Sequence, residues 1–173
     1  MTPRLIVLDV DTDSSEELFR LVNHRLTRDA LVGETFLEAV SRREETYPTG
    51  LDFGHACVAI PHIDPDHVRC PGILLCRNAS QTVFHAMDDP ERELQVALSI
   101  WPLVTDPNNQ IGMLTAVIEL MQDHDGYQVL LHGSGAELRD RLGTGLGAGA
   151  QQARQVPFHR PPTGQSPAGP VGR

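Results

Sequence analysis

Residues 57–62, Cys57-Val58-Ala59-Ile60-Pro61-His62, form a short apolar run that ends at a proline followed by a histidine. The first four residues are apolar without alternation, which is typical of a strand covered on both of its faces. Pro61 has no backbone N–H group to donate to a neighbouring strand, so the strand ends there. A strand covered on both faces needs helices on both sides of its sheet, which favours an α/β fold.

The segments around this strand have the patterns expected of strands and helices that alternate along the chain. Apolar runs predict further strands at residues 4–10, 72–76, 82–87 and 94–104. Capping residues and the spacing of apolar side chains predict helices that begin at Ser14, after Gly33, at Asp106, near Tyr127 and at Ser134. Because helices flank and separate the strands, we predict an α/β fold with a mixed β-sheet flanked by helices.

The composition of the chain changes sharply near Gly143. The length of 173 residues suits one domain. Residues 143–173 are rich in Gly, Pro, Gln and Ser and have almost no apolar periodicity, so they cannot bury enough surface to offset the entropy lost on ordering. We therefore predict one folded domain over residues 1–142 and a disordered Gly/Pro-rich tail over residues 143–173.

Charge and composition exclude several classes of function. The net charge of −9 repels phosphate backbones, so we expect no nucleic-acid partner. No apolar run approaches the roughly 18 residues of a membrane-spanning helix, and the N-terminal stretch is too short and acidic for a signal peptide. We therefore expect a cytoplasmic protein. The three cysteines include no CxxC pair, which excludes a disulfide framework, and the chain lacks a nucleotide-binding glycine loop and a Ser–His–Asp motif.

His62 is the first candidate for chemistry because it directly follows the end of a buried strand. Ligands collect at strand ends in α/β sheets, and a neutral imidazole has one nitrogen free as a nucleophile when the other donates a hydrogen bond. One alternative is a structural histidine at a strand end. Another is a metal site formed with His55, His67 and an aspartate such as Asp64 or Asp66. Their spacing matches no zinc signature, and we expect no metal.

Arg43 is the second candidate. It lies at the polar end of a predicted helix and shortly before Pro48-Thr49-Gly50, a turn that leads the chain toward the strand carrying His62. The planar guanidinium group of an arginine beside a phosphate-accepting histidine neutralises developing negative charge. The alternative is a solvated helix end, at which the arginines and glutamates of residues 42–45 pair with one another.

These residues together resemble a known family. Residues 43–50 (REETYPTG) and 58–62 (VAIPH) are similar to the fructose/mannitol-type enzyme IIA domain of the sugar phosphotransferase system (PTS), also called EIIA type 2. In that family an Arg-Glu pair, a short gap and a Thr-Gly turn precede an apolar strand that ends in Ala-(Ile/Val)-Pro-His. The resemblance continues from about residue 12 to residue 142.

Within that family the chain is most similar to the galactitol-type branch. The stretches that carry this similarity are residues 62–67 (HIDPDH), 71–77, 88–89 and 106–110. Mannitol and fructose members usually have a second histidine at the position of Gln110, whereas galactitol-type members have glutamine. Gln110 keeps a hydrogen-bond donor at the positive end of a helix dipole, although it cannot titrate.

The resemblance implies a role in a phosphorelay. His62 would take the phosphoryl group from the phosphohistidine of the small carrier protein HPr and pass it to a cysteine of the IIB component. IIB would then phosphorylate a sugar or sugar alcohol admitted by the membrane component IIC. Arg43 would be the charge partner of the phosphate, and Gln110 and Thr49 hydrogen-bond donors to it. The family implies phosphorylation at Nε2 of His62, and we expect no cofactor.

Two other interpretations of the same residues stay open. The first is a regulatory IIA-like protein, in which phosphorylation of His62 controls a transcription factor, kinase or transporter. The galactitol-like stretches favour transport, and a nitrogen-type regulatory member would be expected to carry histidine at position 110. The second is a non-catalytic binding domain, which the joint presence of Arg43, the Pro-Thr-Gly turn and the Pro-His strand end disfavours.

Overall fold

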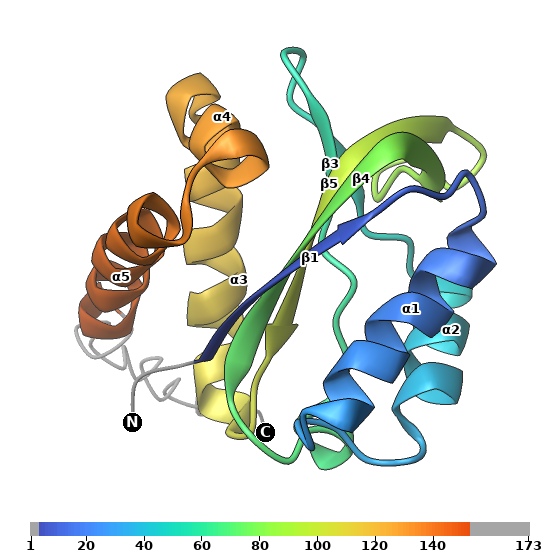
Figure 1. Cartoon of the computed structure of the whole chain (residues 1–173), viewed down its shortest axis with the longest axis horizontal. Helices are drawn as coiled ribbons and strands as arrows, with labels where there is room; N and C mark the ends of the chain where they lie inside the picture. Colours follow the sequence, from blue (N-terminus) through green and yellow to red (C-terminus); the bar gives the residue numbers. More distant parts are fainter. Residues whose placement is uncertain (1–3, 153–173) are drawn as a thin grey trace, which may run out of the picture.

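The computed structural model describes residues 4–152, with side chains described as far as residue 143. Its centre is a five-stranded sheet, shown in Figure 1, with the strands in the order β1 (Arg4–Val10), β4 (Gly72–His85), β5 (Glu93–Leu103), β3 (Cys57–Ala59) and β2 (Gly50–Asp52). β1 runs parallel to β4 and β3 parallel to β5, whereas the β4–β5 and β2–β3 pairs are antiparallel. The predicted mixed sheet is confirmed.

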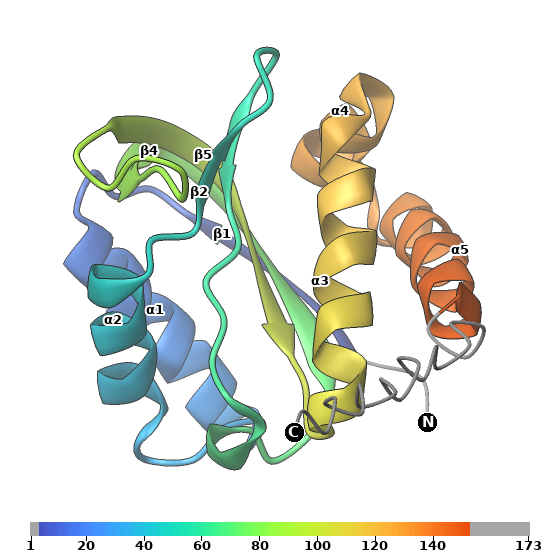
Figure 2. The same cartoon turned by 180° about the vertical axis from the view of Figure 1, so that it is seen from behind.

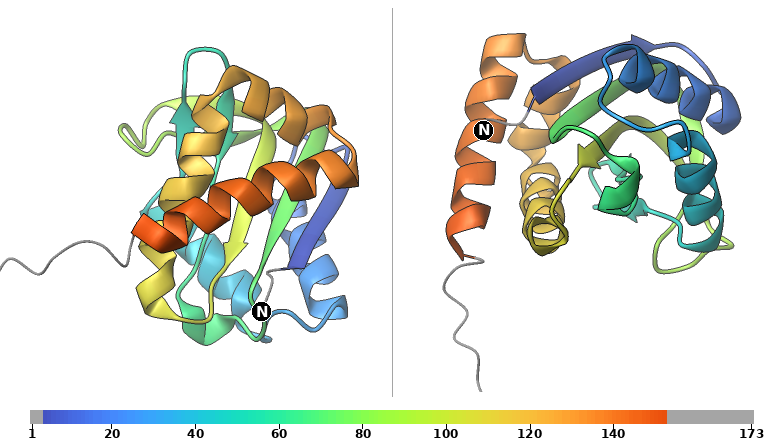
Figure 3. Two further views of the ribbon diagram at one scale, coloured as in Figure 1. Left: turned by 90° about the vertical axis from the view of Figure 1, so that its left-hand side faces the viewer. Right: turned by 90° about the horizontal axis from the view of Figure 1, so that it is seen from below.

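Helices cover both faces of this sheet, as the two views of Figure 3 show. One face carries α1 (Ser15–Arg28) and α2 (Phe36–Thr46), and the other carries α3 (Pro107–Gln122), α4 (His124–His132) and α5 (Gly135–Gln152). Each face has its own buried apolar cluster, with Trp101 against Phe19 on the first and Ile60 in the second. No helix in the described part of the chain is both long and apolar enough to span a membrane.

The helices begin where the capping residues predict. The Ser14 hydroxyl accepts a hydrogen bond from the backbone N–H of Glu17 at 3.2 Å, and α1 starts at the next residue. The Asp106 carboxylate accepts the N–H of Asn108 at 3.0 Å, and Pro107 occupies the first position of α3. This second cap matters for the site, because it places the first turn of α3 directly after β5.

One long strand replaces the two strands predicted at residues 72–76 and 82–87. β4 runs from Gly72 to His85, with an irregularity in its pairing to β5 between Arg77 and Thr82. The Asn78 side chain accepts the N–H of Thr12 at 3.0 Å and donates to the Thr12 carbonyl at 2.7 Å. The polar stretch 77–81 (RNASQ) separates the two apolar runs, which is why the apolar pattern predicted two strands instead of one.

The C-terminal helix also runs further than the sequence indicates. α5 continues to Gln152, ten residues past the boundary predicted at Leu142. The rest of the predicted tail, residues 153–173, lies outside the described residues.

The turn before β2 packs closely against the end of β4, which leaves no room for a side chain at residue 50. A Cβ atom on Gly50 would lie 2.5 Å from the backbone oxygen of His85, and the Gly50 carbonyl accepts the N–H of Met87 at 2.8 Å. We expect Gly50→Ala to lower the free energy of unfolding by about 1–3 kcal/mol, because neither backbone segment moves cheaply. Urea denaturation measures the change.

Gly33→Ala is the matched control for this substitution. The nearest described atom to a Cβ on Gly33 is the His67 backbone oxygen at 3.8 Å, an ordinary contact distance. The control should leave the urea midpoint nearly unchanged. Equal losses in both variants would show that the contact at Gly50 is not the cause.

Candidate functional site

His62 lies just beyond the end of β3, in the chain segment that leads to the short 3₁₀ helix η1 (Pro65–His67). Because β3 and β5 are parallel, their carboxyl ends point toward the same edge of the sheet. In Figure 2 the chain after β3 and the first turn of α3 both lie toward the lower end of the sheet. The strand end thus holds His62 by rigid backbone on the edge where α3 begins.

The two ring nitrogens of His62 have different partners, which together define its tautomer. Nδ1 lies 2.8 Å from the carbonyl oxygen of Ile60, and a carbonyl only accepts, so Nδ1 carries the proton. Nε2 lies 3.3 Å from Nη2 of Arg43, and a guanidinium only donates, so Nε2 presents its lone pair. The geometry therefore places the proton on Nδ1 and leaves the lone pair on Nε2.

The surroundings of His62 also keep its ring neutral. Burial is the main cause that lowers the pKa of His62, and the positive charge of Arg43 lowers it further. The hydrogen bond to Ile60 and the carboxylate of Asp64 act in the opposite direction, but the net shift is downward. A histidine with a pKa below its ordinary value of about 6.5 is unprotonated at neutral pH, and its lone pair is then available for attack.

Arg43 reaches His62 from the last turn of α2. Besides its contact with Nε2 of His62, its Nη1 lies 3.6 Å from Oδ1 of Asp64, whose side chain is 65% exposed. Its Nε is buried and has no hydrogen-bond partner among the described residues. The partner carboxylate is exposed and the pair is long, so this ion pair contributes little to stability.

The predicted alternative for Arg43, a helix end whose charges pair among themselves, does not match these contacts. Arg42 instead pairs with Glu38 one turn earlier on α2, with Nη2 and Oε1 2.7 Å apart. Glu44 accepts hydrogen bonds from Thr49. Of the two arginines in this turn of α2, Arg43 contacts His62 and Arg42 contacts Glu38.

Thr49 lies close to the site, but its donors bond to Glu44. Its backbone N–H lies 2.8 Å from Oε1 of Glu44, and its hydroxyl lies 2.9 Å from Oε2, with only 2% of the residue exposed. The Thr49 carbonyl accepts the N–H of Ile60 at 3.3 Å. In this arrangement Thr49 connects the end of α2 to the strand end that carries His62.

Gln110 lies in the first turn of α3 and is half-buried. Its side-chain amide makes no hydrogen bond with the residues that the structure describes, His62 included. Among the described residues its donor thus has no partner, and it lies at the positive end of the helix, on the edge of the sheet that carries His62.

The other histidines considered as metal ligands lie elsewhere. His55 packs against His124 and Tyr127 of α4, with ring centroids 5.6 and 5.8 Å away, and His67 bonds to the Thr35 hydroxyl at 2.8 Å. Over residues 4–143 no three His, Cys, Asp or Glu side chains are grouped so as to hold a metal ion.

Two residues of the site were not assigned to it from the sequence. Asp64 was considered only as a metal ligand, and Glu44 only as one of the charges of a solvated helix end. The available signal was their position in the sequence. Asp64 lies two residues after His62 and Glu44 directly follows Arg43, and both lie within the stretches that resemble the family.

Comparison with known proteins places the chain in a family. The model of the family described as "Phosphoenolpyruvate-dependent sugar phosphotransferase system, EIIA 2" matches residues 1–141. The chain belongs to this family. It is therefore a IIA component, and IIA components are phosphotransferase relay proteins. A curated relative, the galactitol-specific EIIA component of the PTS in Escherichia coli K12, is 29% identical over 119 residues, which cover 69% of this chain and 78% of the relative.

Solved structures share the fold of this EIIA type-2 domain. The complex of enzyme IIA mannitol with phosphorylated enzyme IIB mannitol from Escherichia coli matches with a TM-score of 0.62 at 20% identity, over 82% of this chain and 94% of the other. The nitrogen regulatory protein IIA-Ntr from Neisseria meningitidis matches with a TM-score of 0.61 at 25% identity, over 79% of this chain and 92% of the other.

Proposed function

We propose that this IIA component accepts a phosphoryl group from phospho-HPr on Nε2 of His62 and passes it to a cysteine of a IIB component. The observation that carries the proposal is the arrangement of His62, with Nδ1 bonded to the Ile60 carbonyl at 2.8 Å and Nε2 3.3 Å from the Arg43 guanidinium. A neutral nucleophile and a cation are held at one strand end.

The transfer balances without a proton leaving His62. The lone pair of Nε2 forms the new N–P bond, while the N–P bond of the donor phosphohistidine breaks and its electron pair returns to the donor imidazole. Nδ1 keeps its proton throughout and donates it in the hydrogen bond to the Ile60 carbonyl. In the next step the thiolate of the IIB cysteine attacks phosphorus, and the electron pair of the breaking bond returns to Nε2 of His62.

Charge stabilisation is the main task left to the protein, because phosphoryl transfer depends largely on positioning and electrostatics. Arg43 supplies a positive charge beside Nε2, and its buried Nε has no hydrogen-bond partner among the described residues, which supports a role in binding an anion. Gln110, in the first turn of α3, offers an amide donor that no other described residue uses. Thr49 acts through its hydrogen bonds to Glu44 and Ile60.

Uptake of a sugar or sugar alcohol, galactitol-like in chemistry, is the proposed purpose of the relay. The galactitol-specific EIIA relative at 29% identity supports it, and the IIA–IIB mannitol complex supports IIB as the acceptor. IIB and the membrane component IIC would choose the sugar. The second candidate is the regulatory role, which the likeness to IIA-Ntr favours. Gln110 in place of a second histidine argues for transport.

Incubation of the protein with phosphoenolpyruvate, enzyme I and HPr tests the proposal. We expect one phosphoryl group, labile in acid as a phosphoramidate is, located on His62 by peptide mapping. Addition of the IIB component should then remove the label from His62. A chain that takes no phosphate from phospho-HPr would contradict the relay, and a stable label that IIB does not discharge would favour the regulatory role.

The lowered pKa of His62 predicts how phosphoryl acceptance depends on pH. Protonation of Nε2 removes the lone pair, so the rate should fall only as the pH drops through a value below the ordinary histidine pKa of about 6.5. Single-turnover transfer from phospho-HPr, measured between about pH 8 and pH 5, provides the profile. A midpoint of the pH profile above the ordinary histidine pKa of about 6.5 would contradict the conclusion that burial favours the neutral ring.

A further inference from the structure

The Glu44 carboxylate holds the turn at Thr49 through hydrogen bonds. It accepts the backbone N–H of Thr49 at 2.8 Å on Oε1 and the Thr49 hydroxyl at 3.1 Å on Oε1 and 2.9 Å on Oε2. It belongs to α2, in the turn that also carries Arg43. A buried carboxylate that accepts a backbone N–H together with a hydroxyl restrains both the side chain and the main chain of its partner.

These contacts continue to the histidine through the backbone. The carbonyl of Thr49 accepts the N–H of Ile60 at 3.3 Å, and the carbonyl of Ile60 accepts Nδ1–H of His62 at 2.8 Å. Gly50, the next residue, packs closely against the end of β4, since a Cβ on Gly50 would meet the His85 backbone oxygen at 2.5 Å and the Gly50 carbonyl accepts the N–H of Met87 at 2.8 Å. The position of the Ile60 carbonyl thus depends on where Glu44 holds Thr49.

We propose that Glu44 is a positioning residue for the phosphoryl acceptor, one that fixes the Nδ1–H tautomer of His62 through Thr49 and Ile60 and so keeps the lone pair on Nε2. The inference rests on the proposed function of His62 and adds to it a residue that does not touch phosphate. Displacement of the Ile60 carbonyl would let the proton move to Nε2, where it blocks attack.

Hydrogen bonding, more than charge, is the property of Glu44 that this role needs. Burial raises the pKa of Glu44, while the hydrogen bonds from Thr49 and the electrostatic interactions with His85 of β4 and with Arg43 of its own helix act to lower it. A glutamine accepts the Thr49 N–H on its oxygen and can donate to the Thr49 hydroxyl. Glu44→Gln should therefore preserve the arrangement, whereas Glu44→Ala removes it.

Nitrogen-15 NMR of the His62 ring in the unphosphorylated protein tests this inference directly. In the wild type the ring should be almost entirely in the Nδ1–H tautomer above its pKa. We expect Glu44→Ala to give a mixture of tautomers and to slow phosphoryl acceptance from phospho-HPr by about 10- to 100-fold, since small misplacements of reacting groups have effects of this size. Glu44→Gln should restore both the tautomer and the rate.

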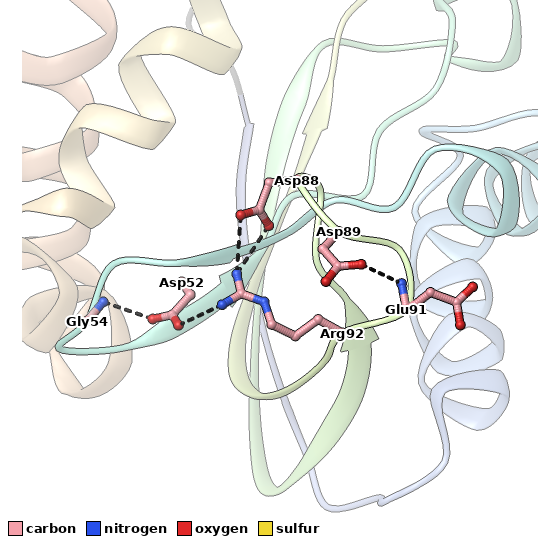
Figure 4. A network of polar contacts seen from close by, with 6 residues as sticks. All are labelled: Asp52, Gly54, Asp88, Asp89, Glu91 and Arg92. Carbon is pink, nitrogen blue, oxygen red and sulfur yellow. Dashed lines mark hydrogen bonds and ion pairs between the residues drawn. The ribbon is translucent and has the colours of Figure 1, made fainter.

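Asp88→Asn is the matched control for a general loosening of the β2–β3 hairpin. Figure 4 shows Arg92 between Asp88 and Asp52, which lies at the end of β2. Nη2 of Arg92 lies 3.1 Å from Oδ1 of Asp88, and Nη1 lies 3.6 Å from Oδ2 of Asp52. This exposed network contacts the same hairpin but does not include Glu44, so the control should keep the wild-type tautomer and rate.

Thr49→Val is a milder variant, which tests the same dependence of the His62 tautomer on the Glu44–Thr49 contact if Glu44→Ala fails to fold. It removes the hydroxyl contact and keeps the backbone one, and it should shift the tautomer in the same direction by a smaller amount. An unchanged tautomer in the folded variants, or a Glu44→Gln protein as impaired as Glu44→Ala, would overturn the inference. Because the NMR measurement needs no phosphate donor, it stays valid even if the wild type accepts no phosphate, a result that would refute only the proposed function.

Discussion

His62→Ala should abolish phosphoryl acceptance completely while the chain still folds. The substitution removes Nε2, the proposed nucleophile, and the side chain is only partly buried, so the core should not be disturbed. Incubation with phosphoenolpyruvate, enzyme I and HPr should leave the variant without any acid-labile phosphate. Circular dichroism and a thermal melt should show the fold of the wild type.

His67→Ala is the control for this experiment. This second histidine lies five residues further along and bonds to the Thr35 hydroxyl at 2.8 Å. The control protein should still accept one phosphoryl group. Phosphate found on any other residue of the His62→Ala protein would contradict the assignment of the nucleophile.

The position of His62 at a strand end could be predicted because its causes are local. A continuous apolar run followed by proline marks a buried strand that stops, and the structure ends β3 at Ala59, two residues before Pro61. The caps of α1 and α3 were predicted for the same reason, since each depends on residues two or three apart.

The sequence did not show a strand that is too short for a periodic pattern, nor one strand that is continuous across a polar stretch. β2 has three residues, too few for a periodic pattern, and it forms through antiparallel pairing with β3. The continuity of β4 depends on Asn78 bonding to Thr12, 66 residues away in the chain. Such partners become visible only when the chain is folded.

The same limit applies to the polar contacts of the candidate site. The contact of Arg43 with His62 spans 19 residues, and no spacing rule predicts it. From the residues alone a solvated helix end was the favoured interpretation, and only the resemblance to a family gave Arg43 its expected role. For Thr49 the residue type was informative, but the direction of its hydroxyl toward Glu44 was not predictable, because that depends on how α2 meets the turn.

Arg43→Ala should slow phosphoryl transfer strongly with little loss of stability. Loss of one charge-stabilising donor typically costs about 2–4 kcal/mol in the transition state, and each 1.4 kcal/mol corresponds to about tenfold in rate. We therefore expect single-turnover transfer from phospho-HPr to slow by roughly 30- to 1000-fold. Removal of the positive charge beside Nε2 should also raise the pKa of His62, so the rate should begin to fall at a higher pH than in the wild type.

Arg42→Ala is the matched control for Arg43→Ala, because it removes the same side chain from the adjacent position of α2. Arg42 pairs with Glu38 on the exposed side of the helix, where both side chains are about three-quarters exposed, at 75% and 76%. Its loss should change neither the rate nor the pH profile, since an exposed pair of this kind contributes little.

The transfer rate of Arg43→Lys should lie between those of the wild type and Arg43→Ala, because lysine keeps the charge but lacks the planar fork that contacts several phosphoryl oxygens at once. A wild-type rate in Arg43→Ala would reduce Arg43 to a structural neighbour of His62. Equal slowing in both alanine variants would show instead that the total charge of the helix end sets the rate. A specific effect of Arg43 would then rest only on a shift of the pH profile that Arg42→Ala does not share.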